Sequence, residues 1–278
     1  MNSEEKKAEP AALTIAGFDP SGGAGIVVDV KTFASLGCVP TAAVTSLTFQ
    51  NSSAVFGAAH QTAEIVRQQV NSILEGSHIA GAKTGMLPTA EIVREVARLF
   101  READLPAPVV DPVMRSTSGY DLIEADAWDL LLSDLMPLAR VITTNVPEAE
   151  RITGLEISDA DGMRRAAQHI REMGARAVLI KGGHLEKQRS EVRGQRSEWG
   201  SSPTMREGSD QAIDVLDDEG EFTVFRGDWI EGPTMRGTGC MLSAAIAAGL
   251  ANGRGLKESV EAAKRFVAVE LSKQQKRG

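Results

Sequence analysis

The sequence is poor in the residues that mark several large classes of protein. Only two cysteines, Cys38 and Cys240, occur in 278 residues, which is too few for a disulfide framework and favours a reducing compartment. The four histidines show no paired spacing for a metal ion. Aromatic residues make up 4% of the chain, with a single tyrosine and three scattered tryptophans, so no surface for stacking nucleic acid bases is indicated.

Basic runs and long apolar runs are missing as well. The formal net charge is -8 and no lysine or arginine cluster interrupts it, which argues against nucleic acid or an anionic membrane as the main partner. No stretch approaches the ~20 apolar residues of a membrane-spanning helix. Residues 1–10, MNSEEKKAEP, form a polar tail without the apolar core of a signal peptide. We therefore expect a cytoplasmic protein that does not bind membranes.

Short apolar runs alternate with segments of helical period from residue 11 onward. Such alternation predicts an α/β fold with three layers, α/β/α, in which helices cover both faces of a mostly parallel central sheet. We expect one domain over residues 11–275, without internal repeats. Residues 51–60 alternate weakly and predict an edge strand or a flap, and residues 211–227 predict a hairpin. The expected strands are 12–17, 39–49, 78–85, 107–113, 139–145 and 176–183, and the expected helices are 25–37, 62–76, 89–103, 160–174, 237–253 and 255–275, with a short helix from residue 147.

A charged segment interrupts this pattern at residues 187–210. It is rich in serine, glycine and both signs of charge and has no apolar period. Structureless segments of this length are uncommon inside a compact domain and are usually lids or disordered insertions. Both alternatives stay open for this segment.

The stretch RGTGCMLSAAIAAG places a glycine turn directly before an alanine-rich helix. The backbone amides of Gly237, Thr238 and Gly239 lead into the helix N-terminus, where unpaired donors and the helix dipole favour an anion such as a phosphate. The same field is expected to lower the pKa of the Cys240 thiol from about 8.5 toward neutrality. Cys240 would then be able to accept a proton from a substrate hydroxyl. Alternatively, it is a buried small apolar side chain.

A second glycine turn, GFDPSGGAG, lies at the first strand-to-helix connection. Its glycines match neither the spacing of the dinucleotide-binding fingerprint nor that of the P-loop. The turn still allows a ligand to approach the backbone at the carboxyl end of a strand, where ligands bind in open parallel sheets.

Seven segments together resemble a known family. The segments LTIAGFDPSGGAGIVVDVKTFASLG, SLTFQNS, GAKTGML, VVDPVM, TNVPEAE, LIKGGH and RGTGCMLSAAIAAG are similar in order and spacing to those of the hydroxymethylpyrimidine/phosphomethylpyrimidine kinases of thiamine biosynthesis. This family belongs to the ribokinase-like superfamily, which also contains pyridoxal kinases. The resemblance implies ATP and Mg²⁺ as cofactors, a small pyrimidine as substrate and a homodimer as the assembly.

The resemblance also implies site residues. Side-chain amides both donate and accept, which suits Gln50 to the edge of an aminopyrimidine, and a methionine gives adaptable apolar contact. Asp29 would accept from the exocyclic amine, or it is simply an acidic residue favoured near a helix N-terminus. Mg²⁺ prefers few carboxylates together with waters and phosphate oxygens, which suits Asp111 and Glu148. The implied pyrimidine-binding residues are Gly17, Asp29, Thr48, Gln50, Met86 and Val113, and those for ATP and the metal are Asp111, Asn145, Glu148, Lys181 and Arg236.

The sequence departs from the family's pattern at a few of these places. Arg236 stands where a histidine usually precedes the glycine turn, and we expect it to add a contact to phosphate. Met241 replaces a usual threonine, Thr48 a common valine, and Thr117 a frequent lysine. Three hypotheses remain: a pyrimidine kinase with Cys240 as base, a pyridoxal kinase of the same fold, and a pyrimidine-binding module without catalysis.

Overall fold

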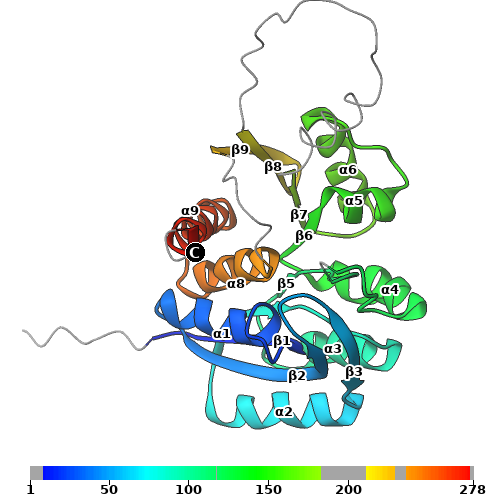
Figure 1. The fold of residues 1–278 in the computed structure, drawn as a ribbon, viewed down its shortest axis with the longest axis vertical. Helices are drawn as coiled ribbons and strands as arrows, with labels where there is room; N and C mark the ends of the chain where they lie inside the picture. Colours follow the sequence, from blue (N-terminus) through cyan, green and yellow to red (C-terminus); the bar gives the residue numbers. More distant parts are fainter. Residues whose placement is uncertain (1–8, 117, 183–210, 229–235, 276–278) are drawn as a thin grey trace, which may run out of the picture.

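The computed structural model describes residues 9–116, 118–182, 211–228 and 236–275. Most of the predicted tail, Thr117 and the predicted 187–210 segment lie outside these ranges. A nine-stranded sheet forms the centre, in the order β3-β2-β1-β4-β5-β6-β7-β8-β9 (Figure 1). The strands are β1 (Ala11–Phe18), β2 (Val39–Gln50), β3 (Val55–His60), β4 (Ile79–Thr84), β5 (Val109–Val110), β6 (Val141–Asn145), β7 (Ala177–Lys181), β8 (Gln211–Asp218) and β9 (Glu221–Asp228).

The pairing of the strands confirms the predicted mostly parallel sheet. Strands β2, β1, β4, β5, β6 and β7 pair with one another in parallel, whereas the pairs β2–β3, β7–β8 and β8–β9 are antiparallel. The segment that predicted an edge strand or a flap contains the edge strand β3. The predicted hairpin is also confirmed, because β8 and β9 pair through a tight turn at residues 219–220 and extend the sheet beyond β7.

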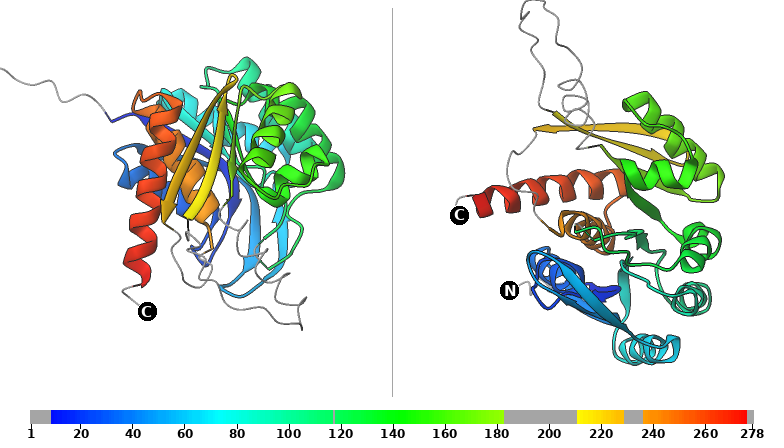
Figure 2. Two further views of the ribbon diagram at one scale, coloured as in Figure 1. Left: turned by 90° about the horizontal axis from the view of Figure 1, so that it is seen from above. Right: turned by 45° about the vertical axis from the view of Figure 1, so that its right-hand side comes forward.

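Helices cover both faces of the sheet, as predicted (Figures 1 and 2). Each face of the sheet has its own buried apolar cluster. One cluster joins the sheet to α2, α3, α4, α5 and α6, and the other joins it to α1, α8 and α9. None of the described helices is long and apolar enough to cross a membrane. The helices are α1 (Gly25–Ser35), α2 (Ala63–Gly76), α3 (Ala90–Glu102), α4 (Ala125–Leu130), α5 (Val146–Thr153), α6 (Ala160–Glu172), α8 (Thr238–Ala251) and α9 (Leu256–Gln275), with short π and 3₁₀ turns η1 (Leu131–Leu135) and η2 (Met136–Leu138) after α4.

Local sequence explains where these elements begin and which faces they bury. Thr62 and Thr89 each accept a hydrogen bond from a backbone amide in the first turn of α2 and α3, which is the usual role of an N-cap threonine. Along β7, Ala177 and Leu179 enter one buried cluster and Val178 and Ile180 the other. An apolar run without polar alternation is typical of a strand that is buried on both faces.

The order of the strands positions a site between β1 and β4. The chain passes from β1 to β2 on one side and later enters β4 on the other side of β1, so the crossovers diverge there. Ligands of open parallel sheets bind in the crevice at such a divergence, beyond the carboxyl ends of the strands. Helix α8 packs on β4 and also contacts β1 and β5, which brings the helix that begins with the glycine turn to this place.

The close approach of α8 to the sheet depends on Gly81 of β4. A Cβ atom at this position would meet the backbone oxygen of Ala247 and the side chain of Ala251, both in α8, at 2.5 and 2.8 Å. Neither neighbour is the flexible end of a long side chain. The helix therefore lies as near to β4 as a glycine allows.

We expect Gly81→Ala to lower the free energy of unfolding by about 1–3 kcal/mol, the usual effect of overpacking a core, because α8 must move outward. Chemical denaturation measures this change. Gly227→Ala on β9 is the matched control, since no atom of the described residues lies within 4 Å of its added Cβ. Equal stability of the two variants would contradict the described packing of α8.

Candidate active site

Charged side chains from three neighbouring parts of the sheet converge beyond the carboxyl ends of its strands. Lys83 is the penultimate residue of β4, Asp111 follows β5, and Lys181 is the last residue of β7. The Nζ atom of Lys181 lies 3.8 Å from Oδ1 of Asp111. Helix α8 begins beside them, since a Cβ on Gly239 would lie 3.6 Å from Lys181 Nζ and 4.0 Å from Asp111 Oδ2.

Beneath this edge lies an ion pair that water does not reach. Lys83 and Asp29 are both fully buried, with 2.9 Å between Nζ and Oδ2. The Thr14 hydroxyl donates to the same Oδ2 atom at 2.7 Å. Burial lowers the pKa of Lys83, but the negative charges of Asp29 and its neighbours outweigh burial, so the pKa is raised and Lys83 stays charged.

This ion pair changes the interpretation of Asp29. The sequence predicted that its carboxylate would accept from a substrate amine, but one oxygen is held by Lys83 and Thr14 and the other is buried without a hydrogen-bond partner among the described residues. With an exposed fraction of 0%, the carboxylate is not accessible to a ligand in this structure. In this structure Asp29 is the partner of Lys83, which the sequence did not reveal, and its contact with a substrate amine stays a prediction.

The two glycine turns touch each other through their backbones. Gly237 has a φ of +78° and a Cβ there would overlap the carbonyl oxygen of Gly23, while a Cβ on Gly25, with a φ of +58°, would overlap the carbonyl oxygen of Gly17. Both positions therefore require glycine, for conformation and for space. The turns predicted from separate parts of the sequence form one backbone-lined floor next to the start of α8.

The N-terminus of α8 has the properties expected of an anion-binding site. Its N-cap, Gly237, has no side chain that could cap the helix, so the first amides of Thr238 and Gly239 have no partner from a capping group. The Ser243 hydroxyl, one turn further along α8, lies 3.2 Å from Asp111 Oδ2 but 3.0 and 3.1 Å from the carbonyl oxygens of Cys240 and Gly239, so its single proton can serve only one of these three acceptors at a time. Lys181 supplies a positive charge on the same side.

Asn145 and Glu148 both serve the local structure of α5. Asn145 Oδ1 accepts from the Glu148 amide and Glu148 Oε2 accepts from the Asn145 amide, each at 2.8 Å. This reciprocal pair is a capping box, the structural role that an acidic residue in a first helical turn often has. Burial raises the pKa of Glu148 to about 7, although Lys181 opposes the rise.

The predicted metal residues bring oxygen ligands to the same edge. Asp111 and Glu148 follow the adjacent strands β5 and β6, and the negative charge of Asp111 adds to the rise in the pKa of Glu148. Among the residues that the structure describes, no three His, Cys, Asp or Glu side chains are grouped to hold a metal ion by themselves. A pair of carboxylates completed by water and phosphate oxygens fits Mg²⁺, which keeps several waters in protein sites.

Cys240 lies in the first turn of α8 with a protonated thiol. Burial is the main cause and raises the pKa of Cys240 to about 11, with Asp111 and Asp29 adding to the rise, whereas Lys83 and the Gly25 amide oppose it. The sequence predicted a pKa near neutrality. That prediction is wrong for this structure because the helix dipole was considered without burial and without the two carboxylates.

Among the residues predicted for the heterocycle, contacts join Met86 to Gly17 of β1 and Thr48 to Gln50 of β2. Met86 packs against Gly17, where an added Cβ would lie 2.9 Å from the sulfur. Thr48 and Gln50, at the end of β2, are joined by a hydrogen bond of 2.8 Å from Nε2 to the hydroxyl. Val113 follows Asp111, and its amide donates to the Asp111 carbonyl at 2.8 Å.

Arg236 points toward this heterocycle side. It was predicted to contact phosphate, but its Nη2 donates to Gln50 Oε1 at 2.5 Å and its Nη1 donates to the Asn51 carbonyl. Its charge is balanced by Asp19, with 3.9 Å between Nη2 and Oδ2. The side chain of Arg236 is therefore directed toward Gln50 and Asn51 in this structure, and its contact with phosphate stays a prediction.

Comparisons with known proteins agree with this geometry. The family model for phosphomethylpyrimidine kinase matches residues 19–278. The chain belongs to the phosphomethylpyrimidine kinase family. It is similar to the hydroxymethylpyrimidine/phosphomethylpyrimidine kinase of Aquifex aeolicus, with 35% identity over 96% of both chains.

Two solved structures resemble this family member closely. The phosphomethylpyrimidine kinase of Clostridium difficile 630 has a TM-score of 0.76 and 35% identity, and the match covers 94% of this chain and 99% of that one. The pyridoxal kinase of Staphylococcus aureus, solved with AMP-PCP and pyridoxal, has a TM-score of 0.78 and 30% identity, covering 94% and 87%. These likenesses confirm the predicted ribokinase-like fold.

Sequence reasoning overlooked three residues at this phosphomethylpyrimidine kinase site. Lys83 was quoted within a motif but given no role, although an ionisable residue inside a strand of apolar neighbours signals a buried partner. Ser243, whose hydroxyl lies 3.2 Å from Asp111 Oδ2, and Asp19, which faces Arg236, carry no such signal. Their roles depend on contacts between distant parts of the chain.

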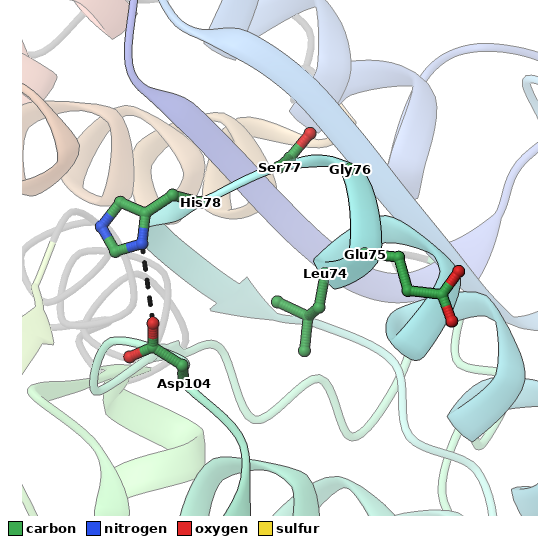
Figure 3. A pocket seen from close by; sticks show the side chains of 6 residues that line it. All are labelled: Leu74, Glu75, Gly76, Ser77, His78 and Asp104. Atoms are coloured by element: carbon green, nitrogen blue, oxygen red, sulfur yellow. Dashed lines mark ion pairs between the residues drawn. The ribbon is translucent and has the colours of Figure 1, made fainter.

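A hollow elsewhere on this phosphomethylpyrimidine kinase fold has a different character. It lies where α2 ends and β4 begins, and Figure 3 shows Leu74, Glu75, Gly76, Ser77, His78 and Asp104 around it. His78 Nδ1 and Asp104 Oδ2 are 3.7 Å apart, but the two side chains are 78% and 95% exposed. The hollow is near the amino end of β4, whereas Lys83 is at the other end of that strand, so it is separate from the candidate site.

The pKa of Cys240 can be tested by alkylation. Because only the thiolate reacts, we expect the rate of Cys240 modification by iodoacetamide to keep rising with pH above 9 and to show no plateau near neutrality. Mass spectrometry of the modified peptides separates it from Cys38, which is 3% exposed. A rate that reaches its plateau between pH 6 and 8 would contradict the environment described for the thiol.

Proposed function

We propose that this chain transfers the γ-phosphoryl group of ATP to the hydroxymethyl group of 4-amino-5-hydroxymethyl-2-methylpyrimidine, and then to the monophosphate so formed, in thiamine biosynthesis. Membership of the phosphomethylpyrimidine kinase family supports the reaction class. The observation that carries the proposal is that Lys181 and Asp111 lie beside the first turn of α8, whereas Arg236, just before that turn, holds Gln50 of β2.

Phosphoryl transfer requires mainly positioning and electrostatic stabilisation, because its transition state is loose. The backbone amides of Gly237, Thr238 and Gly239 would receive the transferred phosphoryl group at the N-terminus of α8. Lys181 would neutralise part of its charge. These groups are fixed before any ligand binds, which lowers the reorganisation needed during reaction.

The nucleotide would lie along the ends of β5, β6 and β7. Asn145 would orient it while its side chain also caps α5. Asp111 and Glu148 would hold Mg²⁺, which neutralises charge on the phosphates when bound. A divalent cation near Glu148 would favour its ionised form, opposing the effect of burial.

The pyrimidine would bind between the backbone of Gly17 and the side chains of Met86, Val113 and Gln50. Gln50 would form hydrogen bonds with the polar edge of the ring, and Met86 would pack against its face. Asp29 would act indirectly, by holding the charge of Lys83 beneath the site. Cys240 would accept the proton of the substrate hydroxyl, for which a high pKa makes its thiolate a strong but scarce base.

The substrate can be identified by measuring ATP consumption with three acceptors. We expect turnover with the aminopyrimidine alcohol and with its monophosphate, and at least tenfold lower kcat/KM with pyridoxal, since a mismatched polar edge leaves buried groups unpaired. Preference for pyridoxal would instead favour the activity named for the Staphylococcus aureus relative. Binding without turnover of any acceptor would reject the kinase proposal in favour of a binding module.

Two substitutions separate the anion site from the base. We expect Gly239→Ala to lower kcat/KM by about 10²-fold, as does loss of an anion-stabilising donor, because the added methyl group fits beside Lys181 but occupies the space for phosphate. Cys240→Ala should lower kcat by only about 10-fold, below the usual contribution of a general base, because most of the thiol is protonated at neutral pH.

Steady-state kinetics measure both effects, with Gly227→Ala as the control for a glycine that has open space around it. A Gly239→Ala variant with unchanged kcat/KM would contradict the anion site. Full activity of Cys240→Ala would contradict the base.

The remaining expectations concern assembly and location. We propose a homodimer, from the family resemblance, which sedimentation velocity of the purified chain tests directly. A cytoplasmic location remains part of the same proposal.

A further inference from the structure

Gln50 is held by hydrogen bonds at both ends of its side-chain amide. Nε2 donates to the Thr48 hydroxyl at 2.8 Å, and Oε1 accepts from Arg236 Nη2 at 2.5 Å. The Thr48 hydroxyl in turn donates to the Phe18 carbonyl at 2.8 Å. A continuous chain of hydrogen bonds therefore runs from β1 through β2 to the residue that precedes the glycine turn of α8.

The chemistry of the two partners leaves one orientation for the amide. A hydroxyl has a single proton, and that of Thr48 is used on a carbonyl oxygen that can only accept, so toward Gln50 the hydroxyl can only accept. A guanidinium has donors and no acceptor, so Arg236 can meet only the oxygen of the amide. Both ends independently require Nε2 toward Thr48 and Oε1 toward Arg236, although an isolated amide could turn over.

Arg236 is itself anchored, so that it can impose this orientation. Its second nitrogen donates to the Asn51 carbonyl, next to Gln50 in the chain. Asp19, with an exposed fraction of 1%, faces the guanidinium at 3.9 Å and is fixed through its other oxygen by the Ser21 amide and hydroxyl. An opposite charge within this distance favours the position that Arg236 occupies.

The orientation leaves one N–H on Nε2 and one lone pair on Oε1 for a ligand. A 4-aminopyrimidine presents a ring nitrogen that accepts beside an amine that donates. A 4-oxopyrimidine presents the reverse order, a ring N–H beside a carbonyl oxygen, and would need the amide turned over. Turning it over would break both hydrogen bonds and set like groups against Thr48 and Arg236.

We propose that Thr48 and Arg236 are specificity-determining positioning residues, which lock the Gln50 amide in the orientation that accepts 4-aminopyrimidines and rejects 4-oxopyrimidines. This inference rests on the proposed function for the identity of the ligand. It adds that selection between the two ring types depends on two residues that need not touch the ring themselves.

The lock is the pair of hydrogen bonds that Gln50 forms with Thr48 and Arg236, and it is tested by measuring how well the chain discriminates between ligands. Isothermal titration calorimetry on the full chain would compare Kd for 4-amino-5-hydroxymethyl-2-methylpyrimidine with Kd for its 4-oxo analogue. We expect Thr48→Val, which keeps the shape but loses the acceptor, and Arg236→Met each to reduce the preference for the amino compound by about five- to tenfold, the effect of one hydrogen bond. The double variant should reduce it further.

The controls are the same substitutions made elsewhere. Thr41→Val removes a hydroxyl that donates to the Ala12 carbonyl, on the same strand β2 but away from Gln50, and Arg226→Met removes an exposed guanidinium on β9. Neither should change the ratio of the two Kd values. A loss of general stability would weaken both ligands alike and leave that ratio unchanged.

The outcomes distinguish this inference from the proposed function. If the unaltered chain prefers the amino compound and neither Thr48→Val nor Arg236→Met changes the ratio, the lock is refuted and the kinase proposal stands. If the unaltered chain binds the two compounds equally, the lock is refuted as well. If it binds neither, both proposals fail together.

Discussion

The buried ion pair between Lys83 and Asp29 is the constraint on which the site depends. It joins β4 to α1 beneath the start of α8, and neither group is reached by water. Removing one partner would leave an uncompensated buried charge, which typically destabilises a protein by about 3–5 kcal/mol. The pair therefore fixes the spacing between the strand and the helix that flank the glycine turns, and its positive end faces the sulfur of Cys240.

The carboxyl edge of the sheet carries charged side chains of both signs, and neither sign dominates. Lys83 and Lys181 face Asp29, Asp111 and Glu148, and the negative charges of these carboxylates raise the pKa of the lysines. Charges interact strongly here because water is largely excluded. Burial raises the pKa of Glu148 to about 7 and that of Cys240 to about 11, so an incoming anion or cation changes the protonation of this edge as well as its net charge.

Much of the fold could be predicted from the sequence because the information is local. Segments of helical period predicted the helices, and runs of apolar residues predicted strands that are buried on both faces. The six-residue helix α4 is too short to show a period. At the site, the sequence indicated which polar residues lie at strand ends, but it did not indicate which side chains pair with one another. Lys83 lies 54 positions from Asp29, and Arg236 lies 186 positions from Gln50.

The backbone of Arg236 continues into Gly237, which rests on the carbonyl oxygen of Gly23, while its side chain holds Gln50. In the proposed function, one residue thus adjoins the groups that would bind both substrates. Cooperativity between the substrates follows when one of them displaces this residue, and thermodynamic reciprocity then fixes its size: the factor by which nucleotide alters the affinity for the heterocycle equals the factor by which the heterocycle alters the affinity for nucleotide.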